Sequence, residues 1–428
     1  MNTLRKAAII GGVRIPFARS NTAYAGAANL DMLSAALKAL VERFGLRAQA
    51  LGEVAAGAVI KHPRDAGLAR EATLASGLDP HTPAYDLQRA CGTSLSALAQ
   101  LAQRIAAGEL ESAVAGGVDS VSDVPITYGR RLQGIVLESA RARSPGARLK
   151  PWLRLRPRDL RPAVPAITEP STGLSMGEHC EQMAKEWRIG RQEQDALANA
   201  SHLNAAAAWK EGFFDDLVVP FGGLKSDNNI RAGSTLESLA KLKPAYDRSA
   251  AGTLTAGNST PLTDGASCVL LGSEAWAKSR GLPILAYLTC SASAAVDFTG
   301  ATGPAEGLLM APTYAVPRML ERLGLTLQDF DIYEIHEAFA AQVLCTLKAW
   351  ESARYCKERL GRDRPLGAID RARLNPRGSS VAVGHPFAAT GTRIVATLAK
   401  QLAQRGKGRG LISVCTAGGM GVAAVLER

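Results

Sequence analysis

Two regions of the chain alternate short apolar runs with amphipathic stretches, one before residue 126 and one after residue 265. Short apolar runs between turn residues are typical of buried strands, and apolar residues at about every third or fourth position are typical of helices. The predicted strands are Leu4–Gly11, Glu53–Val59, Ala84–Ala90, Ser112–Gly116, Ala266–Leu271, Ile284–Cys290, Ile332–Ile335 and Leu411–Cys415. The predicted helices are Asp31–Phe44, Arg70–Ser76, Gly92–Ala107, Thr313–Leu323, Ala338–Ala349 and Thr390–Gln404. This alternation favours an α/β fold with a mostly parallel sheet.

The segment between these two regions has a different pattern. It contains few strand-like runs, several prolines and two predicted helices, Gly177–Glu186 and Arg191–Glu211. On each side of the segment a predicted strand runs into a cysteine, at Cys91 and at Cys415. We therefore expect two similar α/β halves and an inserted, mainly helical region. The expected bounds are 1–126 with 251–283 for the first half, 127–250 for the insertion and 284–428 for the second half.

Composition narrows the class of protein. A length of 428 residues with 46% hydrophobic residues suits about two or three domains. No apolar run is long enough to cross a membrane, and the N-terminal run Ala7–Val13 ends too soon for a signal peptide. The seven cysteines include no CxxC pair, which argues against a disulfide framework and against a zinc site. We therefore expect no bound metal and a reducing, cytoplasmic location.

The net charge of +11 is concentrated in one stretch. Residues 130–161 contain nine Arg and one Lys against only Glu138 and Asp159, together with Trp152. Such a stretch suits contact with a partner subunit, an anionic membrane surface or a phosphorylated substrate. A solvated, solubilising face is the alternative. Nucleic acid is the weakest candidate, because no nucleic-acid-binding motif accompanies the charge.

Cys91 is the first candidate for chemistry. It lies in Gln88-Arg89-Ala90-Cys91-Gly92-Thr93-Ser94, between a predicted strand and a predicted helix. Free N–H groups and the helix dipole at such a junction favour a thiolate, which predicts a nucleophile with a lowered pKa. A buried structural cysteine is the alternative.

Three further polar residues lie at predicted strand ends or turns, where α/β folds place their sites. His385, between Gly384 and Pro386, suits a general base or an oxyanion donor, although a surface-turn histidine fits equally. Cys415 precedes a glycine-rich turn, so it suits proton exchange with substrate carbon; a phosphate-binding loop is the rival interpretation. His336 lies at a strand-to-helix junction, where a capping or core role is also reasonable.

Taken together these motifs resemble the thiolase family. The resemblance covers essentially the whole chain and rests on five blocks in the family's order. They are Cys-Gly-Thr-Ser at 91–94, Asn-Ser-Thr-Pro-Leu-Thr-Asp-Gly-Ala at 258–266, His-Glu-Ala-Phe-Ala at 336–340, Gly-His-Pro at 384–386 and Cys-Thr-Ala-Gly-Gly-Met-Gly at 415–421. The family's fold has two similar halves in five layers, α-β-α-β-α, with an inserted loop domain. It therefore implies the same division of this chain.

Some positions depart from the common thiolase pattern. His336 stands where many relatives have Asn, and Phe387-Ala388-Ala389 replaces a more usual glycine-containing stretch. With the basic insertion, these features resemble the thiolase β-subunit of fatty-acid oxidation complexes, both bacterial anaerobic-type and mitochondrial trifunctional. Ala417 stands where many relatives have Gly, which suffices if the position supplies only a backbone N–H.

The resemblance implies CoA-dependent cleavage of a 3-ketoacyl-CoA to acetyl-CoA and a shortened acyl-CoA, in fatty-acid β-oxidation. Cys91 would carry the acyl group, His385 would act as its base and Cys415 would protonate the leaving carbon. His385 with a water near His336 would form one oxyanion site. The N–H groups of Cys91 and Ala417 would form the other.

The resemblance also places CoA, as a co-substrate rather than a tightly bound cofactor, against the insertion. The residues it assigns to CoA contact are Met176, Arg231, Ser238, Ser259 and Thr260. It further implies a homodimer or homotetramer, and suggests a hydratase/dehydrogenase α-subunit as partner.

Three other functions stay open at this point. The first is biosynthetic joining of two acetyl-CoA units, since the same residues catalyse both directions. The second is a decarboxylating ketoacyl synthase of the same fold, against which Cys415 argues. The third is a non-catalytic scaffold or membrane-anchoring subunit, suggested by the basic stretch but disfavoured by the intact catalytic residues.

Overall fold

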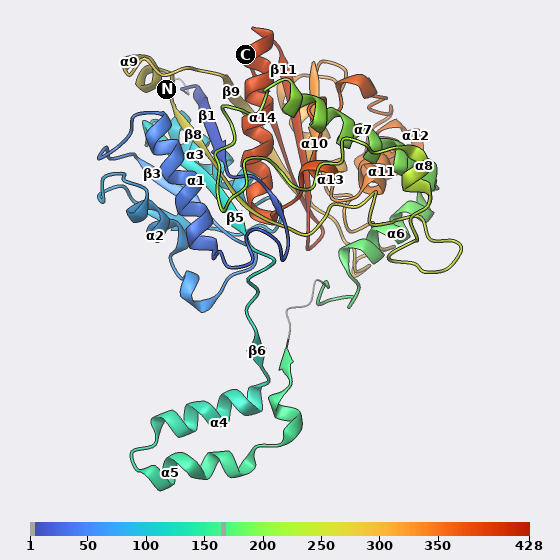
Figure 1. The fold of residues 1–428 in the computed structure, drawn as a ribbon. Coiled ribbons are helices and arrows are strands. Elements are labelled where there is room, and N and C mark those ends of the chain that lie inside the picture. Colours follow the sequence, from blue (N-terminus) through green and yellow to red (C-terminus); the bar gives the residue numbers. More distant parts are fainter. Residues whose placement is uncertain (1–4, 164–167) are drawn as a thin grey trace.

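The structure is a computed structural model that describes residues 5–163 and 168–428 (Figure 1). Its strands are β1 (Ala7–Arg14), β2 (Ala18–Arg19), β3 (Glu53–Ala56), β4 (Ala84–Asp86), β5 (Ser112–Asp119), β6 (Thr127–Tyr128), β7 (Pro162–Ala163), β8 (Thr263–Ser273), β9 (Ala286–Ala295), β10 (Ile332–Ile335), β11 (Arg409–Thr416) and β12 (Met420–Glu427). Each strand predicted from the sequence is present, Ile332–Ile335 with the predicted bounds and the others with one or both ends shifted. Leu4, the predicted start of the first strand, lies outside the described residues, and β2, β6, β7 and β12 were not predicted.

The predicted helices are present as well. The helices are α1 (Asn29–Arg43), α2 (Leu68–Ala75), α3 (Thr93–Ala107), α4 (Arg130–Arg141), α5 (Pro145–Leu149), α6 (Met176–Glu186), α7 (Arg191–Lys210), α8 (Leu236–Ala240), α9 (Glu274–Ser279), α10 (Pro312–Leu323), α11 (Ala340–Glu351), α12 (Ala353–Leu360), α13 (Ser380–Val383) and α14 (Thr390–Arg405). Short 3₁₀ turns lie at Pro63–Asp65, Lys150–Arg154, Pro157–Leu160, Arg371–Arg373 and Phe387–Ala389. Among these described helices, none combines the length and apolarity that a membrane crossing requires.

One large sheet runs through the body in the order β10-β11-β12-β9-β1-β8-β5-β3-β4. The expectation of a mostly parallel sheet is wrong: β3 pairs in parallel with β4 and β5, and β10 with β11, whereas the pairings made by β1, β8, β9 and β12 are antiparallel. Both β1 and β8 are buried along their whole length. A strand buried on both faces reads as a continuous apolar run whatever its direction, so the sequence pattern did not reveal the direction.

The sheet contains the same strand arrangement twice. The first series is β3-β5-β8-β1, and the second is β10-β11-β12-β9. In each series the first two strands pair in parallel, and the third strand, which is the last of the four in chain order, pairs antiparallel with the second. The fourth strand, which is the first in chain order, pairs antiparallel with the third. The two series join where Ala7–Ile9 pairs with Ala286–Leu288. This repeat is the structural basis of the two similar halves.

The hydrophobic core divides the body into five layers. α3 and α14 pack in the middle, between one face of each strand series. α1 and α2 cover the outer face of the first series, and α10 and α11 cover the outer face of the second. The order is therefore α-β-α-β-α, and the expected fold is confirmed. The middle layer matters for function, because α3 and α14 both begin beside the candidate nucleophile and base.

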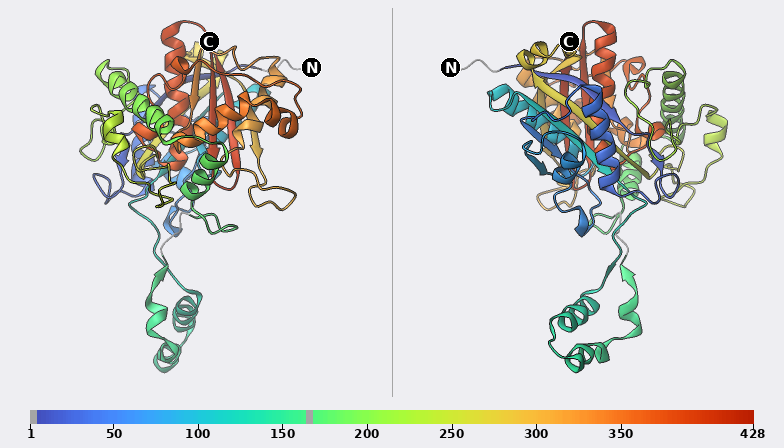
Figure 2. Two further views of the ribbon diagram at one scale, coloured as in Figure 1. Left: turned by 90° about the vertical axis from the view of Figure 1, so that its right-hand side faces the viewer. Right: turned by 60° about the vertical axis from the view of Figure 1, so that its left-hand side comes forward.

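Residues 127–163, hereafter the arm, project from the body in every view (Figures 1 and 2). β6 and β7 form its two-stranded stalk. Beyond the stalk, α4 packs against α5 and the Lys150–Arg154 turn. The basic stretch recognised in the sequence therefore forms a small helical appendage, whose helix α4 was not predicted.

Candidate active site

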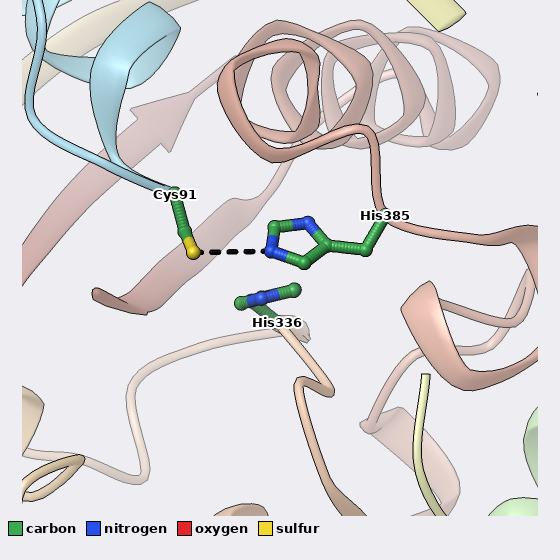
Figure 3. A group of neighbouring side chains, drawn as sticks. All are labelled: Cys91, His336 and His385. Carbon is green, nitrogen blue, oxygen red and sulfur yellow. Dashed lines mark hydrogen bonds between the residues drawn. The ribbon is translucent and has the colours of Figure 1, made fainter. Parts of the chain in front are cut away.

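Cys91 and His385 face each other (Figure 3), shortly before the N-terminal ends of the middle-layer helices α3 and α14. Cys91 lies in the turn between β4 and α3, and His385 in the loop between α13 and α14. His385 Nε2 lies 3.1 Å from Cys91 Sγ. A nucleophile and base in hydrogen-bond reach are the minimum for nucleophilic catalysis.

The backbone around Cys91 is unusual. The predicted strand does not reach the cysteine, since β4 ends at Asp86. Ala90, the residue before Cys91, has a φ of +42°, which is uncommon for a side chain other than Gly. Thr93 holds this turn, because its hydroxyl accepts the Arg89 N–H at 2.9 Å and donates to the Ala90 carbonyl at 2.7 Å. The turn places Cys91 just before the N-terminus of α3.

The expectation that Cys91 has a lowered pKa is wrong. The side chain stays partly accessible, yet desolvation raises its pKa to about 12. Hydrogen bonds from the N–H of Ala417 and from its own N–H lower the pKa, and the charge of Asp119 raises it. Burial therefore outweighs the dipole of the helix end that the sequence suggested. In the resting protein Cys91 is a thiol, so it needs a base to become a nucleophile.

His385 lies in the position of that base, with Nε2 3.1 Å from the Cys91 sulfur. Desolvation, with a smaller effect of Arg393, lowers its pKa to about 3, so the ring is neutral at neutral pH. Its Nδ1 lies 2.5 Å from the Thr390 hydroxyl. Because the neighbouring sulfur is a thiol, the S–H donates to Nε2, and Nδ1–H donates to Thr390.

The loop that carries His385 is fixed on both sides. Gly384 has a φ of +109°, and a Cβ there would lie 2.7 Å from Thr263 Cγ2, so the position requires Gly. The His385 N–H donates to Thr263 Oγ1 at 2.6 Å. Buried Asp119 accepts the Ala388 N–H at 2.7 Å, and burial raises the pKa of this carboxyl to about 7. These contacts hold the ring against Cys91.

His336 completes a group of three (Figure 3). It is fully buried, and its ring centroid lies 4.1 Å from that of His385. Its Nδ1 lies 2.7 Å from Ser380 Oγ, which also accepts a 2.7 Å hydrogen bond from Arg393. Its Nε2 has no hydrogen-bond partner among the described residues. Desolvation, then His385 and Arg393, hold the pKa of His336 well below its usual value.

The end of β11 approaches the nucleophile from the other side. Cys415 is buried there, and desolvation, followed by the charge of Cys91, raises the pKa of its thiol well above the ordinary value. The next turn brings the Ala417 N–H to the Cys91 sulfur. Glu169 anchors this turn, because its carboxylate accepts the Gly418 N–H at 2.9 Å. Both N–H groups named as an oxyanion site thus converge on Cys91 Sγ.

The residues expected to contact CoA fall into two groups. Ser259 and Thr260 adjoin the catalytic loops: Ser259 forms a β-bridge with Phe339, and Thr260 donates to the Ser380 carbonyl at 2.8 Å. Met176 packs in the same hydrophobic cluster as Cys415. Arg231 and Ser238 are exposed on the insertion instead, and the Ser238 hydroxyl caps α8 through Thr235.

Sequence reasoning missed the residues that orient the catalytic groups. They are Thr390, Ser380, Arg393 and Asp119, and the contacts of Ser380 with His336 and of Asp119 with Ala388 join distant segments. Thr390 alone had a local signal, as a hydroxyl residue five positions after His385 at a predicted helix start. The resemblance placed Cys91, His336 and His385 in one active site, but the sequence did not indicate that they form a set of metal-ligating side chains, because metal motifs are recognised by short spacing.

Comparison with known proteins agrees with this geometry. Residues 7–275 match the family model for the thiolase N-terminal domain, and residues 289–428 match the model for the thiolase C-terminal domain. The chain therefore belongs to the thiolase family, as the sequence motifs predicted.

Individual relatives match nearly the whole chain. It is 44% identical over 425 residues to proteins named 3-ketoacyl-CoA thiolase from Yersinia pestis (strain Pestoides F) and Yersinia pseudotuberculosis (serotype O:1b, strain IP 31758), covering 98% of this chain and 96% of each relative. The crystal structure of the Bacillus anthracis acetyl-CoA acetyltransferase matches with a TM-score of 0.82 and 31% identity, over 100% of both chains.

Proposed function

We propose that the protein is a 3-ketoacyl-CoA thiolase, an acyltransferase that shortens fatty acyl chains in β-oxidation. The observation that carries the proposal is the 3.1 Å approach of His385 Nε2 to Cys91 Sγ, with the Ala417 N–H on the same sulfur. Full-length similarity to proteins named 3-ketoacyl-CoA thiolase supports the substrate class.

The first half-reaction transfers the acyl group to the protein. His385 takes the thiol proton of Cys91, and the sulfur attacks the 3-keto carbon of the substrate. The bond between C2 and C3 then breaks, and its electron pair moves to C2 as an acetyl-CoA enolate. Cys415 gives its proton to C2 and releases acetyl-CoA, which leaves acyl-Cys91. The high pKa of both thiols means that each carries its proton before substrate binds.

The second half-reaction returns the protein to its starting state. The Cys415 thiolate takes the proton of an incoming CoA thiol, and the CoA sulfur attacks the acyl carbon. The shortened acyl-CoA leaves, and the Cys91 thiolate recovers its proton from His385. The sum is one 3-ketoacyl-CoA and one CoA converted to acetyl-CoA and an acyl-CoA. Two half-reactions through a covalent intermediate predict ping-pong kinetics.

Two oxyanion sites stabilise the charges on oxygen. The N–H groups of Cys91 and Ala417 would hold the tetrahedral oxygen formed on the acyl carbon. His385 and His336 would hold the enolate oxygen, with His336 Nε2 donating directly or through a water. The Ser380 hydroxyl supports this role, because it accepts from Arg393 and can donate to His336 Nδ1, which leaves the proton on Nε2.

Mass spectrometry tests the acyl intermediate. The protein is mixed with a 3-ketoacyl-CoA, quenched and digested, and we expect the acyl mass on the peptide that contains Cys91. Cys91→Ser should show no thioester adduct. An adduct confined to another residue, or full turnover by Cys91→Ala, would contradict the proposal.

The biosynthetic direction is the second candidate, since the TM-score of 0.82 to an acetyl-CoA acetyltransferase favours it. Both candidates use the same residues. Rates with purified acyl-CoAs of increasing length, measured in both directions, distinguish them: selective joining of two acetyl-CoA units would favour the biosynthetic role.

CoA would bind as a co-substrate against the insertion. We propose the division 1–126 with 251–283, 127–250 and 284–428, which the repeated strand order supports. Within this division, Ser259, Thr260 and Met176 would contact the reacting end of CoA, because they adjoin the catalytic loops and Cys415. Arg231 and Ser238 would contact the part of CoA that lies at the protein surface, where the Arg suits a phosphate group of CoA.

The arm would contact an anionic membrane surface. Its two acids are neutralised internally, since Glu138 pairs with Arg154 and Asp159 pairs with Arg131 at 3.2 Å. The other basic side chains of the arm make no ion pair within the described chain. Large apolar side chains are exposed beside them, with Leu153 at 87% and Leu149 at 69%. Basic and apolar groups on one appendage match a headgroup region better than they match free phosphate.

Location and assembly complete the proposal. All seven cysteines are unpaired, which supports a reducing compartment, and we assign the protein to the cytoplasm. A homodimer or homotetramer, and a hydratase/dehydrogenase α-subunit as partner, stay predictions of the family resemblance. Light scattering of the purified protein, alone and with a candidate α-subunit, measures both.

A further inference from the structure

Three metal-ligating side chains converge in the interior of the protein. One ligand atom from each of Cys91, His336 and His385 lies within 4.8 Å of the other two. A thiol and two imidazoles are the ligand types that Zn²⁺ prefers. Because the three residues come from different segments, sequence spacing gave no sign of this set.

The surrounding hydrogen bonds are those of a metal site. The Nδ1 atoms of both histidines face hydroxyl groups, Thr390 Oγ1 for His385 and Ser380 Oγ for His336. Thr390 Oγ1 accepts from His385 Nδ1–H, and in the metal-bound state the Ser380 hydroxyl would turn to accept from His336 Nδ1–H, the opposite tautomer to that of an Nε2–H oxyanion donor, so that both Nε2 lone pairs are free to bind a metal. Partners of this kind orient metal-bound histidines in proteins. The buried Nε2 of His336 has no other partner in the described chain, so it is available as a ligand.

We propose that Cys91, His336 and His385 form a binding site for Zn²⁺, and that occupation of this site reversibly inhibits the protein. Zn²⁺ would form one bond to Cys91 Sγ and one to the Nε2 of each histidine, and the thiol proton would leave to solvent. A water would take the fourth, open position. While bound, the metal would cap the nucleophile and remove the lone pair of the base.

The required movement is small. Zinc lies about 2.3 Å from sulfur and about 2.0–2.1 Å from nitrogen, so tetrahedral ligand atoms are about 3.5 Å apart. Cys91 Sγ and His385 Nε2 are already 3.1 Å apart. The widest separation in the set, no more than 4.8 Å, must close by about 1 Å. A rotation of the His336 side chain would supply this 1 Å shift, because the side-chain hydrogen bond of His336 runs from Nδ1 to the hydroxyl of Ser380, which can follow the movement.

Charge near the site also favours a cation. The carboxylates of Asp119 and Glu169 lie close enough to Cys91 to act on its charge, and both disfavour an isolated thiolate. A divalent ion reverses that effect, because it neutralises the thiolate and is attracted by the same carboxylates. Relatives with Asn in place of His336 would lack the third ligand, so the site depends on a departure from the common thiolase pattern.

Co²⁺ is the probe that tests the site, because its absorption reports the ligands directly. We expect one Co²⁺ per chain in the substrate-free protein, with a near-ultraviolet thiolate-to-cobalt band and visible bands of tetrahedral coordination. Zn²⁺ should displace Co²⁺ and abolish turnover, and a chelator should restore it. The spectrum is independent of the reaction, so its outcome stands even if the proposed function is wrong.

Variants assign the ligands. Cys91→Ser should lose the thiolate band, and His336→Asn should weaken Co²⁺ binding at least about 10-fold. Ser380→Ala, which keeps all three ligands, should weaken it about 10- to 100-fold. The control Cys290→Ser removes a thiol of β9 that the site does not use, and it should bind as the wild type does. A thiolate band that survives Cys91→Ser, or equal affinity in His336→Asn, would overturn the proposal, and so would the absence of any band.

Discussion

The catalytic centre and the arm use their residues in opposite ways. At the centre, His336 and His385 are buried, and each of their Nδ1 atoms faces a hydroxyl from another position. On the arm, Leu149, Trp152 and Leu153 are exposed among arginines, and α4 and α5 pack on each other and on the neighbouring 3₁₀ turns. The chemistry of the centre therefore depends on geometry set by the whole fold, whereas that of the arm depends mainly on its composition.

This difference has a physical origin. Burial removes water from the centre, so desolvation is the largest influence on the pKa of Cys91, His336 and His385 alike. In that environment the gain or loss of one hydrogen bond has a large effect on the energy of a buried polar or charged group. On the arm, water screens each charge, and single side chains contribute little. Single substitutions should therefore have large effects at the centre and graded effects on the arm.

The largest effect is expected for Cys91→Ala. Removal of the nucleophile should lower kcat at least about 10⁴-fold, because His385 Nε2 then has no thiol to activate. Steady-state thiolysis of a short 3-ketoacyl-CoA measures it. The arm should not matter in this assay, so the triple charge reversal described below serves as the control. A kcat that fell equally in both variants would remove the distinction between the two regions.

The second largest effect, again a loss in kcat, is expected for His336→Ala. Loss of one oxyanion donor costs about 10²- to 10³-fold in kcat, and KM for CoA should change much less. His179→Ala is the matched control, since His179 is also buried but bonds to Thr172 outside the catalytic group. If KM rose while kcat held, His336 would be a binding residue rather than an oxyanion donor.

The same contrast explains what the sequence could predict. The motifs around Cys91, His385 and Cys415 predicted the candidate reacting groups, because each block is local. The pKa of Cys91 was predicted in the wrong direction, since desolvation depends on neighbours that are distant in the chain. The predicted end of this strand was also wrong, because β4 ends at Asp86 and the turn before Cys91, where Ala90 has a positive φ, has no signal in the sequence pattern.

At the fold level, local pattern again predicted the elements better than their pairing. The α/β class and most of the helices of the body followed from apolar periodicity, and the two halves were inferred from the strand-to-cysteine junctions at Cys91 and Cys415. Strand direction did not, because β8 and β1 are buried along their length in antiparallel pairing. The arm showed its charge in the sequence, but its projection depends on the β6–β7 stalk, whose strands have only two residues each.

The third effect is expected for the arm with Arg154, Arg156 and Arg158 changed to Glu. Each Arg near an anionic surface contributes about 1 kcal/mol, so three should change vesicle binding at least about 10²-fold. Sedimentation with phosphatidylcholine vesicles, with and without phosphatidylserine, measures it. The control places the same charge change on α12, as Arg354, Lys357 and Arg359 to Glu. Unchanged vesicle binding would exclude the membrane, and a raised KM for CoA instead would assign the arm to CoA phosphates.

The smallest expected effect is that of Leu153→Ser on vesicle binding, and its comparison with Leu98→Ala separates the arm from the body most directly. Leu153 is 87% exposed, so Leu153→Ser should leave the free energy of unfolding within about 0.5 kcal/mol of the wild type. Insertion of this side chain into a headgroup region would add about 1 kcal/mol, so vesicle binding should weaken about five-fold. Leu98, fully buried in the middle layer, is the contrast, because Leu98→Ala should cost about 2–5 kcal/mol of stability.

Chemical denaturation gives the free energy of unfolding of each of these two variants, and vesicle sedimentation gives the vesicle affinity of each. The comparison holds if Leu98→Ala changes only stability and Leu153→Ser changes only vesicle binding. Loss of stability in Leu153→Ser would mean that its exposed side chain packs against another chain in solution. The arm would then be an interface between subunits, and its arginines would serve a protein partner rather than a lipid surface.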